Sequence, residues 1–268
     1  MKVSAIVPIF NEEKTVRTVA KTLFDSPLIS ELIFVNDGST DRTPQILRDF
    51  DDERIKIISL KRNHGKGFAL ASGIRKAQGE VVAFFDADLI DLSNQHIERL
   101  LEPIINGDSK VVLGVPLKNK SDLYRPWVVP LTGERAYSRE NLLPYLEKIS
   151  EKRYGIEIFL NSLYDKKETK IVQLNDLISP TKWEKRTPTE AVREYILEIK
   201  EIAEELGKRK GLLPEDYKVL SKLTEAMDFN EFKERIKKIK DKKIKEILEK
   251  YLLKYLNLAK GKFKNLFS

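Results

Sequence analysis

The sequence contains no cysteine and only two histidines among its 268 residues. The lack of cysteine excludes disulfide bonds, zinc sites built from thiolates and a cysteine nucleophile. No apolar run approaches the roughly 20 residues needed to span a bilayer. The apolar stretch at the N-terminus is interrupted at Asn11, which is too early for a signal peptide. These absences predict a soluble, cytoplasmic protein, and the 34% charged fraction is typical of thermophiles.

Basic charge is concentrated in the last part of the chain. Residues 231–268 contain 13 Lys and Arg against 5 Asp and Glu, whereas the net charge of the whole chain is +7. The preceding residues therefore carry a net charge of −1, and we expect no nucleic acid as a partner.

Short apolar runs alternate with amphipathic stretches through the first half of the chain. Strands are expected at residues 3–9, 31–36, 55–60, 80–85, 110–114 and 170–174, with helices at 14–24, 44–50, 67–76, 95–105, 140–148 and 156–163. Residues 116–135 are rich in proline and predict a loop. The alternation predicts an α/β fold with a mostly parallel sheet flanked by helices, followed by a helical extension from about residue 189.

Polar residues follow the first two predicted strands, at the edge where open α/β sheets bind ligands. Pro8, Asn11 and Glu13 lie at the end of the first strand, and Asp37 follows the second. A carboxylate at residue 37 is suited to accept a hydrogen bond from the edge of a uracil or guanine base. The alternative is that Asp37-Gly38-Ser39 is only a tight turn.

Two further motifs predict a site for a diphosphate and a metal ion. The segment R-N-H-G-K-G at residues 62–67 opens a helix, where backbone N–H groups and the Lys66 ammonium favour anions. Asp86-Ala87-Asp88 follows an apolar strand, with two carboxylates separated by one small residue. Hard cations such as Mg²⁺ or Mn²⁺ prefer such oxygen ligands and retain positions for phosphate oxygens.

Four segments, V-P-I-F-N-E-E, V-N-D-G-S-T-D, R-N-H-G-K-G-F-A and F-D-A-D-L, occur in this order. Together they resemble glycosyltransferase family 2 and its GT-A relatives. The resemblance implies a GT-A catalytic domain at 1–188, with nucleotide-sugar binding in 1–115 and the acceptor region in 116–188. It also implies Asp37 at the base, Glu13 near the ribose, Lys66 near the phosphates, and Asp86 with Asp88 at the ribose and metal.

The acceptor region resembles glucosyl-3-phosphoglycerate synthases in L-T-G-E-R-A (131–136) and Y-G-I-E-I (154–158). The resemblance implies that Gly133, Glu134 and Arg135 lie near the acceptor. It places Glu157 near the reacting centre, so Glu157 and Asp88 are the predicted catalytic residues. The alternative for Glu157 is an ordinary acid in the first turn of a helix.

One position departs from these relatives, which often carry a histidine as a further metal ligand. Ser179 stands at that position, and no histidine follows it. The remaining ligands would then be the two aspartates, the diphosphate and water, or Asp176.

The helical region at 189–268 contains an apolar face at helical spacing over residues 236–267, opposite a face of lysines. Such a face either binds an anionic membrane surface or packs on the catalytic domain or a second subunit.

The motifs together predict metal-dependent sugar transfer from a UDP- or GDP-sugar to a small anionic acceptor such as a phosphoglycerate. Transfer to a polyprenyl phosphate and non-catalytic binding of a nucleotide-sugar are the alternatives. The sequence leaves open the sugar, the acceptor and the stereochemical outcome.

Overall fold

The computed structural model describes residues 1–117, 131–153, 155–185, 187, 190–191, 193–198, 200–201, 205, 219, 229–242, 245–246 and 248–249. It divides into two compact units, Met1–Pro180 and Thr181–Ser268. The division falls eight residues before the boundary expected at 188. The expected helices of the second unit lie largely outside the described residues, apart from short stretches such as α8 (Lys182–Lys185) and α11 (Phe229–Lys237).

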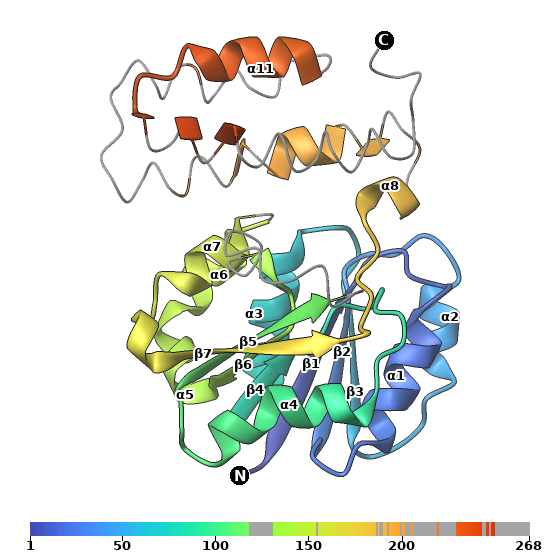
Figure 1. Cartoon of the computed structure of the whole chain (residues 1–268). Helices are drawn as coiled ribbons and strands as arrows, with labels where there is room; N and C mark the ends of the chain where they lie inside the picture. Colours follow the sequence, from blue (N-terminus) through green and yellow to red (C-terminus); the bar gives the residue numbers. More distant parts are fainter. Residues whose placement is uncertain are drawn as a thin grey trace. The chain divides into compact units, whose positions relative to one another are not determined.

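Unit 1 is built on a seven-stranded sheet with the order β3-β2-β1-β4-β6-β5-β7 (Figure 1). The strands are β1 (Val3–Ile9), β2 (Glu31–Asn36), β3 (Ile55–Ser59), β4 (Val81–Phe84), β5 (Val111–Leu117), β6 (Arg135–Ser138) and β7 (Thr169–Asn175). Strand β6 runs antiparallel to its neighbours β4 and β5, and all other pairs are parallel. The expected α/β fold with a mostly parallel sheet is confirmed.

Helices cover both faces of this sheet and bury two apolar layers. On one face lie α1 (Val16–Asp25), α2 (Thr43–Arg48) and α4 (Asn94–Ile105), and on the other lie α3 (Lys66–Lys76), α5 (Arg139–Leu142), α6 (Leu146–Ser150) and α7 (Ile156–Asn161). Strand β1 contributes to both layers, because successive side chains point to opposite faces: Ala5 and Val7 join the first layer and Ile6 the second. Burial on both faces explains why every residue of this strand except Ser4 is apolar.

Strand β6 is the element that the sequence did not predict. Residue 135 was expected to end a loop and residues 136–139 were assigned to no element, whereas Arg135–Ser138 pairs with both β4 and β5. The expected loop at 116–135 otherwise lies outside the described residues from 118 to 130. The sequence R-A-Y-S does not resemble a buried strand because it starts with a charged residue and ends with a polar one.

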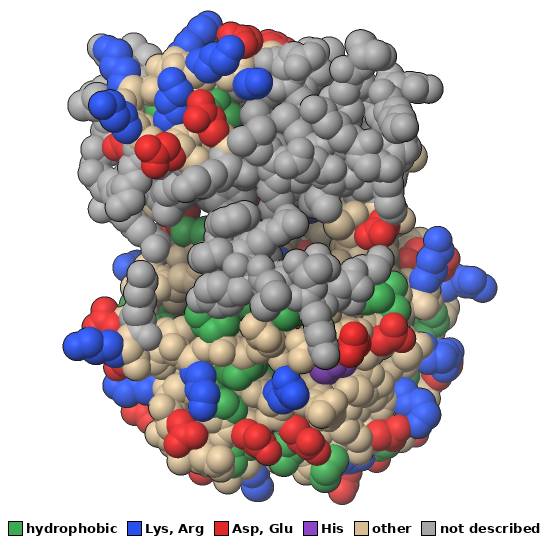
Figure 2. All heavy atoms as spheres, viewed as in Figure 1, with side chains coloured by type: hydrophobic (Ala, Val, Ile, Leu, Met, Phe, Trp, Pro, Cys, Tyr) green, Lys and Arg blue, Asp and Glu red, His purple; other side chains and the backbone are tan. Residues whose placement is uncertain are grey.

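The charge distribution agrees with the sequence. Figure 2 shows acidic and basic side chains interspersed over the visible face of unit 1, without a continuous basic patch.

Three residues of the apolar face predicted at 236–267 are described and buried within the chain, namely Ile236, Ile239 and Leu248. Burial of these side chains agrees with a packing face, and residues 250–268 lie outside the described part of the chain. Among the described helices, none combines the length and apolar character needed to cross a membrane.

Candidate functional site

The polar motifs of the first half meet at one edge of the sheet. In the parallel register Ile9 is opposite Asn36, and Ile6 is opposite Phe84, so β1, β2 and β4 end close together. Asn11 and Asp37 follow the ends of β1 and β2, and Asp86 comes two residues after β4. The carboxyl ends of parallel strands are where α/β sheets bind ligands.

Asp37 connects the end of β2 to the loop that precedes α3. Its two carboxylate oxygens accept the backbone N–H groups of His64 (2.8 Å) and Gly65 (2.7 Å). The side chain is only 3% exposed, and burial raises the pKa of Asp37 although both N–H donors and the His64 and Arg153 charges oppose this. The carboxylate therefore fixes the loop, and each of its oxygens retains a second lone pair that can accept a hydrogen bond.

The residues after β1 are held by the turn after β2. Asn11 has a positive φ of 57°, and its side-chain oxygen accepts the Thr40 N–H at 2.8 Å. The carboxylate of Glu13 accepts the backbone N–H of Arg42 at 3.0 Å and its Nε at 3.3 Å, which lowers the pKa of Glu13. Pro8 lies within β1, opposite Val35. Asn11 and Glu13 are thus both held against the turn that follows Asp37, whereas Pro8 lies within the strand.

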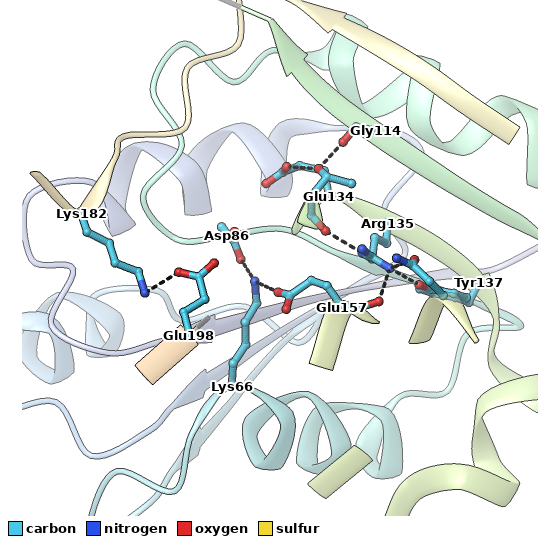
Figure 3. Close-up of polar contacts among 11 residues, drawn as sticks. Lys66, Asp86, Gly114, Glu134, Arg135, Tyr137, Glu157, Lys182 and Glu198 are labelled. Carbon is cyan, nitrogen blue, oxygen red and sulfur yellow. Dashed lines mark hydrogen bonds and ion pairs between the residues drawn. The ribbon is translucent and has the colours of Figure 1, made fainter. Parts of the chain in front are cut away.

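Lys66 joins two carboxylates from different parts of the chain (Figure 3). Its Nζ lies 2.7 Å from Asp86 Oδ1 and 2.9 Å from Glu157 Oε1. Burial would lower the pKa of Lys66, but the Asp86 and Glu157 carboxylates outweigh it and raise that pKa. Three residues that the sequence singled out separately therefore form one charged centre, contributed by α3, the end of β4 and the first turn of α7.

The oxygen ligands expected for a metal are present around this centre. Asp86 and Asp88 are half-buried at the end of β4, and Ala87 between them is buried. A side chain at Gly133 would overlap the Asp86 carboxylate, so glycine leaves the space that this carboxylate occupies. Among the described residues, no group of three or more His, Cys, Asp and Glu side chains is arranged to hold a metal ion. The two carboxylates of Asp86 and Asp88 fit the usual Mg²⁺ site, in which one or two carboxylates act together with substrate phosphates.

Glu134 is buried beside this centre. Its carboxylate accepts the Thr132 hydroxyl at 2.9 Å, and the same hydroxyl also contacts the Gly114 carbonyl. Burial, together with the nearby Asp86 charge, raises the pKa of Glu134 to about 8, although Lys66 and Thr132 lower it.

Arg135 differs from its expected surroundings. The residue is 1% exposed, and its Nε donates to the Thr132 carbonyl at 2.6 Å. Its Nη1 contacts Tyr137 Oη (3.1 Å), Asn161 Oδ1 (2.7 Å) and the Glu157 carbonyl (3.4 Å). The guanidinium predicted to meet an acceptor thus lies inside the protein, between β6 and α7 (Figure 3).

Sequence reasoning missed several residues that shape the site. Arg153 packs on Gly65 and donates to Asn63 Oδ1 at 3.0 Å, which covers the loop that Asp37 holds. Asn161, one helical turn after Glu157, completes the Arg135 contacts. The signal available was its spacing of four residues from Glu157, which places both on one side of a helix.

The position of the missing histidine is close to the predicted metal ligands. Ile178 and Ile90 form a bridge with hydrogen bonds of 2.9 and 3.1 Å, so Ser179 lies next to the segment that follows Asp88. The alternative ligand Asp176 is exposed, with a φ of 67°. The buried His96 has a structural role, because its Nε2 bonds to the Asn175 carbonyl (2.8 Å).

Comparison with known proteins agrees with this geometry. Uncharacterized glycosyltransferase YkcC of Bacillus subtilis (strain 168) is 36% identical over 127 residues, 45% of this chain and 39% of that protein. The bactoprenol glucosyl transferase of Shigella phage SfV is 38% identical over 97 residues, 34% of this chain and 32% of that protein. The matches thus span less than half the length of these curated relatives.

Among solved structures, M. tuberculosis glucosyl-3-phosphoglycerate synthase superposes with a TM-score of 0.62 at 25% identity, covering 79% of this chain and 81% of that chain. The same synthase in complex with Mn²⁺, UDP-glucose and phosphoglyceric acid gives a TM-score of 0.60 at 24% identity, covering 77% and 80%. These structures share the GT-A fold with unit 1. The sequence model of the family described as glycosyl transferase family 2 matches residues 4–170. The chain therefore belongs to glycosyl transferase family 2.

Proposed function

We propose that this protein transfers a sugar from a nucleoside diphosphate sugar to an anionic acceptor. The observation that carries the proposal is the pair of contacts that Lys66 Nζ makes with Asp86 (2.7 Å) and Glu157 (2.9 Å) at the ligand-binding edge of the sheet. Sugar transfer needs a cation near the departing diphosphate and a carboxylate near the acceptor hydroxyl. We assign the first role to Lys66 and the second to Glu157.

The donor is held in the order in which the motifs follow the chain. The Asp37 carboxylate accepts hydrogen bonds from the N–H groups at the edge of a uracil or guanine base. Asn11 and Glu13 lie toward the ribose, and Lys66 lies toward the diphosphate. The backbone at Pro8 and Ala87 lies against the nucleotide. We assign the UDP- or GDP-sugar class on this basis, in keeping with the UDP-glucose complex of the M. tuberculosis synthase.

Asp86 and Asp88 are the residues proposed to hold Mg²⁺ or Mn²⁺ together with the donor. A divalent cation at this place would offset the negative charge that develops on the departing nucleoside diphosphate. Ser179 supplies no imidazole, so the affinity for the metal depends strongly on the diphosphate. Glu157 is proposed to accept the proton of the attacking acceptor hydroxyl or to orient that hydroxyl.

The acceptor is proposed to be a small phosphorylated acid of the phosphoglycerate kind, bound beside Gly133 and Glu134. The solved synthase with the same fold is in complex with phosphoglyceric acid. A polyprenyl phosphate is the second candidate, favoured by the bactoprenol glucosyl transferase and by a dodecaprenyl-phosphate galacturonate synthase 38% identical over 96 residues.

The first experiment is thermal unfolding with UDP, GDP, ADP and dTDP, each with and without Mn²⁺, in the wild type and in Asp88→Ala. We expect one nucleotide to stabilise the wild type, with a larger shift when metal is present and a smaller one in the variant. No shift with any nucleotide would contradict the proposed function.

The second experiment identifies the acceptor by release of the nucleoside diphosphate. 3-Phosphoglycerate in solution and undecaprenyl phosphate in vesicles are offered separately with the sugar donors of the stabilising nucleotide. Turnover with only one of them decides between the two acceptors. Nucleotide stabilisation without turnover on either would favour a non-catalytic nucleotide-sugar binding protein.

A further inference from the structure

Helix α7, which carries Glu157, is too short to hold its own position. It spans only the six residues Ile156–Asn161, and its N-cap residue is Gly155, which has no side chain to cap the first turn. Isolated helices of this length are unstable in water because nucleation costs more than a few hydrogen bonds return. The place of the Glu157 carboxylate therefore depends on what α7 contacts.

Arg135 contacts α7 from the sheet. Its Nη1 lies 2.7 Å from Asn161 Oδ1 and 3.4 Å from the Glu157 carbonyl, so it reaches the first and last turns of the helix. Arg135 and Tyr137 alternate along β6 and thus point to the same face of the sheet. The Tyr137 hydroxyl, 3.1 Å from the same Nη1, extends this connection between β6 and α7.

The same guanidinium also holds the segment beside Asp86. Its Nε donates to the Thr132 carbonyl at 2.6 Å, and the next residue, Gly133, packs directly on the Asp86 carboxylate. In the antiparallel register Arg135 is opposite Phe84, two residues before Asp86. Arg135 therefore connects the surroundings of both carboxylates that Lys66 bridges.

A guanidinium that is 1% exposed is costly to bury unless its donors are satisfied. Its planar group presents donors in fixed directions, so it sets the distances among the groups that accept from it. An apolar residue would fill the same space without fixing those distances. The arrangement is thus better suited to positioning than to packing alone.

We propose that Arg135 is a positioning residue that sets the separation of Asp86 and Glu157, and not a residue that binds the acceptor. The inference deepens the proposed function and rests on it for the role of Glu157. Its structural part, the coupling of Arg135 to the Lys66 ion pairs through α7, is measurable without any substrate.

The substrate-free test uses thermal unfolding of Arg135→Lys, Lys66→Met and the double variant. Lysine keeps the charge but cannot donate in the fork that joins Thr132 to α7. If Arg135 positions Glu157, the double variant loses clearly less Tm than the sum of the two single losses, because the ion pairs of Lys66 are already weakened. Additive losses would overturn the proposal.

Arg139 provides the matched control. It is half-buried, and its Nε donates to the Ile74 carbonyl at 3.2 Å, so Arg139→Lys disturbs a comparable arginine-to-carbonyl bond without touching α7. Its loss of Tm is expected to add to that of Lys66→Met. Should Arg135→Lys fail to fold, Asn161→Leu replaces it in the same cycle, since it removes the acceptor on the helix.

The kinetic test separates positioning from binding. In Arg135→Lys we expect kcat to fall on the order of 10²-fold, the cost of misplacing a reacting group by about 1 Å, while the KM values for donor and acceptor change less than about threefold. A large rise in the acceptor KM at unchanged kcat would show acceptor binding and overturn the proposal. A wild type that shows no turnover would count against the proposed function alone, because the unfolding cycle still measures the coupling.

Discussion

Replacing Lys66 by methionine tests the charged centre most directly. Methionine is close to lysine in length and removes the ammonium that lies 2.7 Å from Asp86 and 2.9 Å from Glu157. The two carboxylates then face each other across a site where their side chains are only 26% and 12% exposed. Like charges in such surroundings destabilise the folded state because neither is fully solvated.

The expected loss follows from this burial. Removing one partner of a fully buried ion pair costs about 3–5 kcal/mol, and the partial exposure here reduces the cost to roughly 2–3 kcal/mol. For a unit of this size, 1 kcal/mol corresponds to about 2–4 °C in Tm, so Lys66→Met should unfold roughly 4–12 °C below the wild type.

Thermal unfolding in the presence of EDTA measures this loss. Lys110→Met is the control, because Lys110 forms an ion pair of similar length with Glu168 (2.6 Å) but is 62% exposed. Exposed pairs contribute up to about 1 kcal/mol, so the control should lose less than about 4 °C. Adding Mg²⁺ should restore part of the Tm of Lys66→Met, since the freed carboxylates then bind a cation. A loss no larger than that of the control would refute the reasoning.

Three further substitutions give distinct results. Glu31→Gln should lower stability more at pH 7 than at pH 3. Burial raises the pKa of Glu31, yet its bonds to Lys56 and neighbouring donors lower that pKa overall. The contribution of Glu31 is therefore fully present above the unfolded pKa and decreases as the pH falls toward the folded value. Urea unfolding at both pH values measures this, and an equal loss at both would contradict it. Gly133→Ala should displace the Asp86 carboxylate. The rise in Tm that the nucleotide and Mn²⁺ together produce should fall at least about threefold, with little loss of Tm in their absence. An unchanged response to nucleotide and metal would contradict the close packing of Gly133 on Asp86. Asp37→Asn should weaken nucleotide binding by about tenfold or more, because an amide supplies one acceptor oxygen in place of two. Isothermal titration measures the affinity, and an unchanged affinity would show that Asp37 does not bind the base.

The parallel part of the fold could be predicted because its strands are buried on both faces. Val81–Phe84 is apolar throughout, Val3–Ile9 is apolar except for Ser4, and both end at polar motifs, so both the strands and the edge where Asp86 lies follow from the sequence. Strand β6 could not be predicted in this way. Its first residue is a buried arginine, and the acceptors that satisfy that charge come from residues 132 and 161, which no local pattern connects.

The site was predicted residue by residue but not as a set of contacts. The resemblance implies that Lys66 lies near a diphosphate, and the structure shows that its Nζ bridges Asp86 and Glu157. A sequence motif indicates which chemical groups a loop carries, and their pairing depends on how α3, β4 and α7 pack. The roles of all the predicted site residues stay predictions until the experiments above are made.

The insertion of β6 between β4 and β5 has a consequence for the order of folding. The pairs β1–β2 and β2–β3 are each closed across about twenty intervening residues, whereas β1 meets β4 across about seventy and β4 meets β6 across about fifty. Closing these longer loops costs more chain entropy, so both pairings of β4 are expected late. A chain stalled at that stage would already possess the turn that holds Asp37, but it would lack the Arg135 connection and so the assembled charged centre. Nucleotide recognition and catalytic competence are therefore expected to appear as separate kinetic phases during refolding.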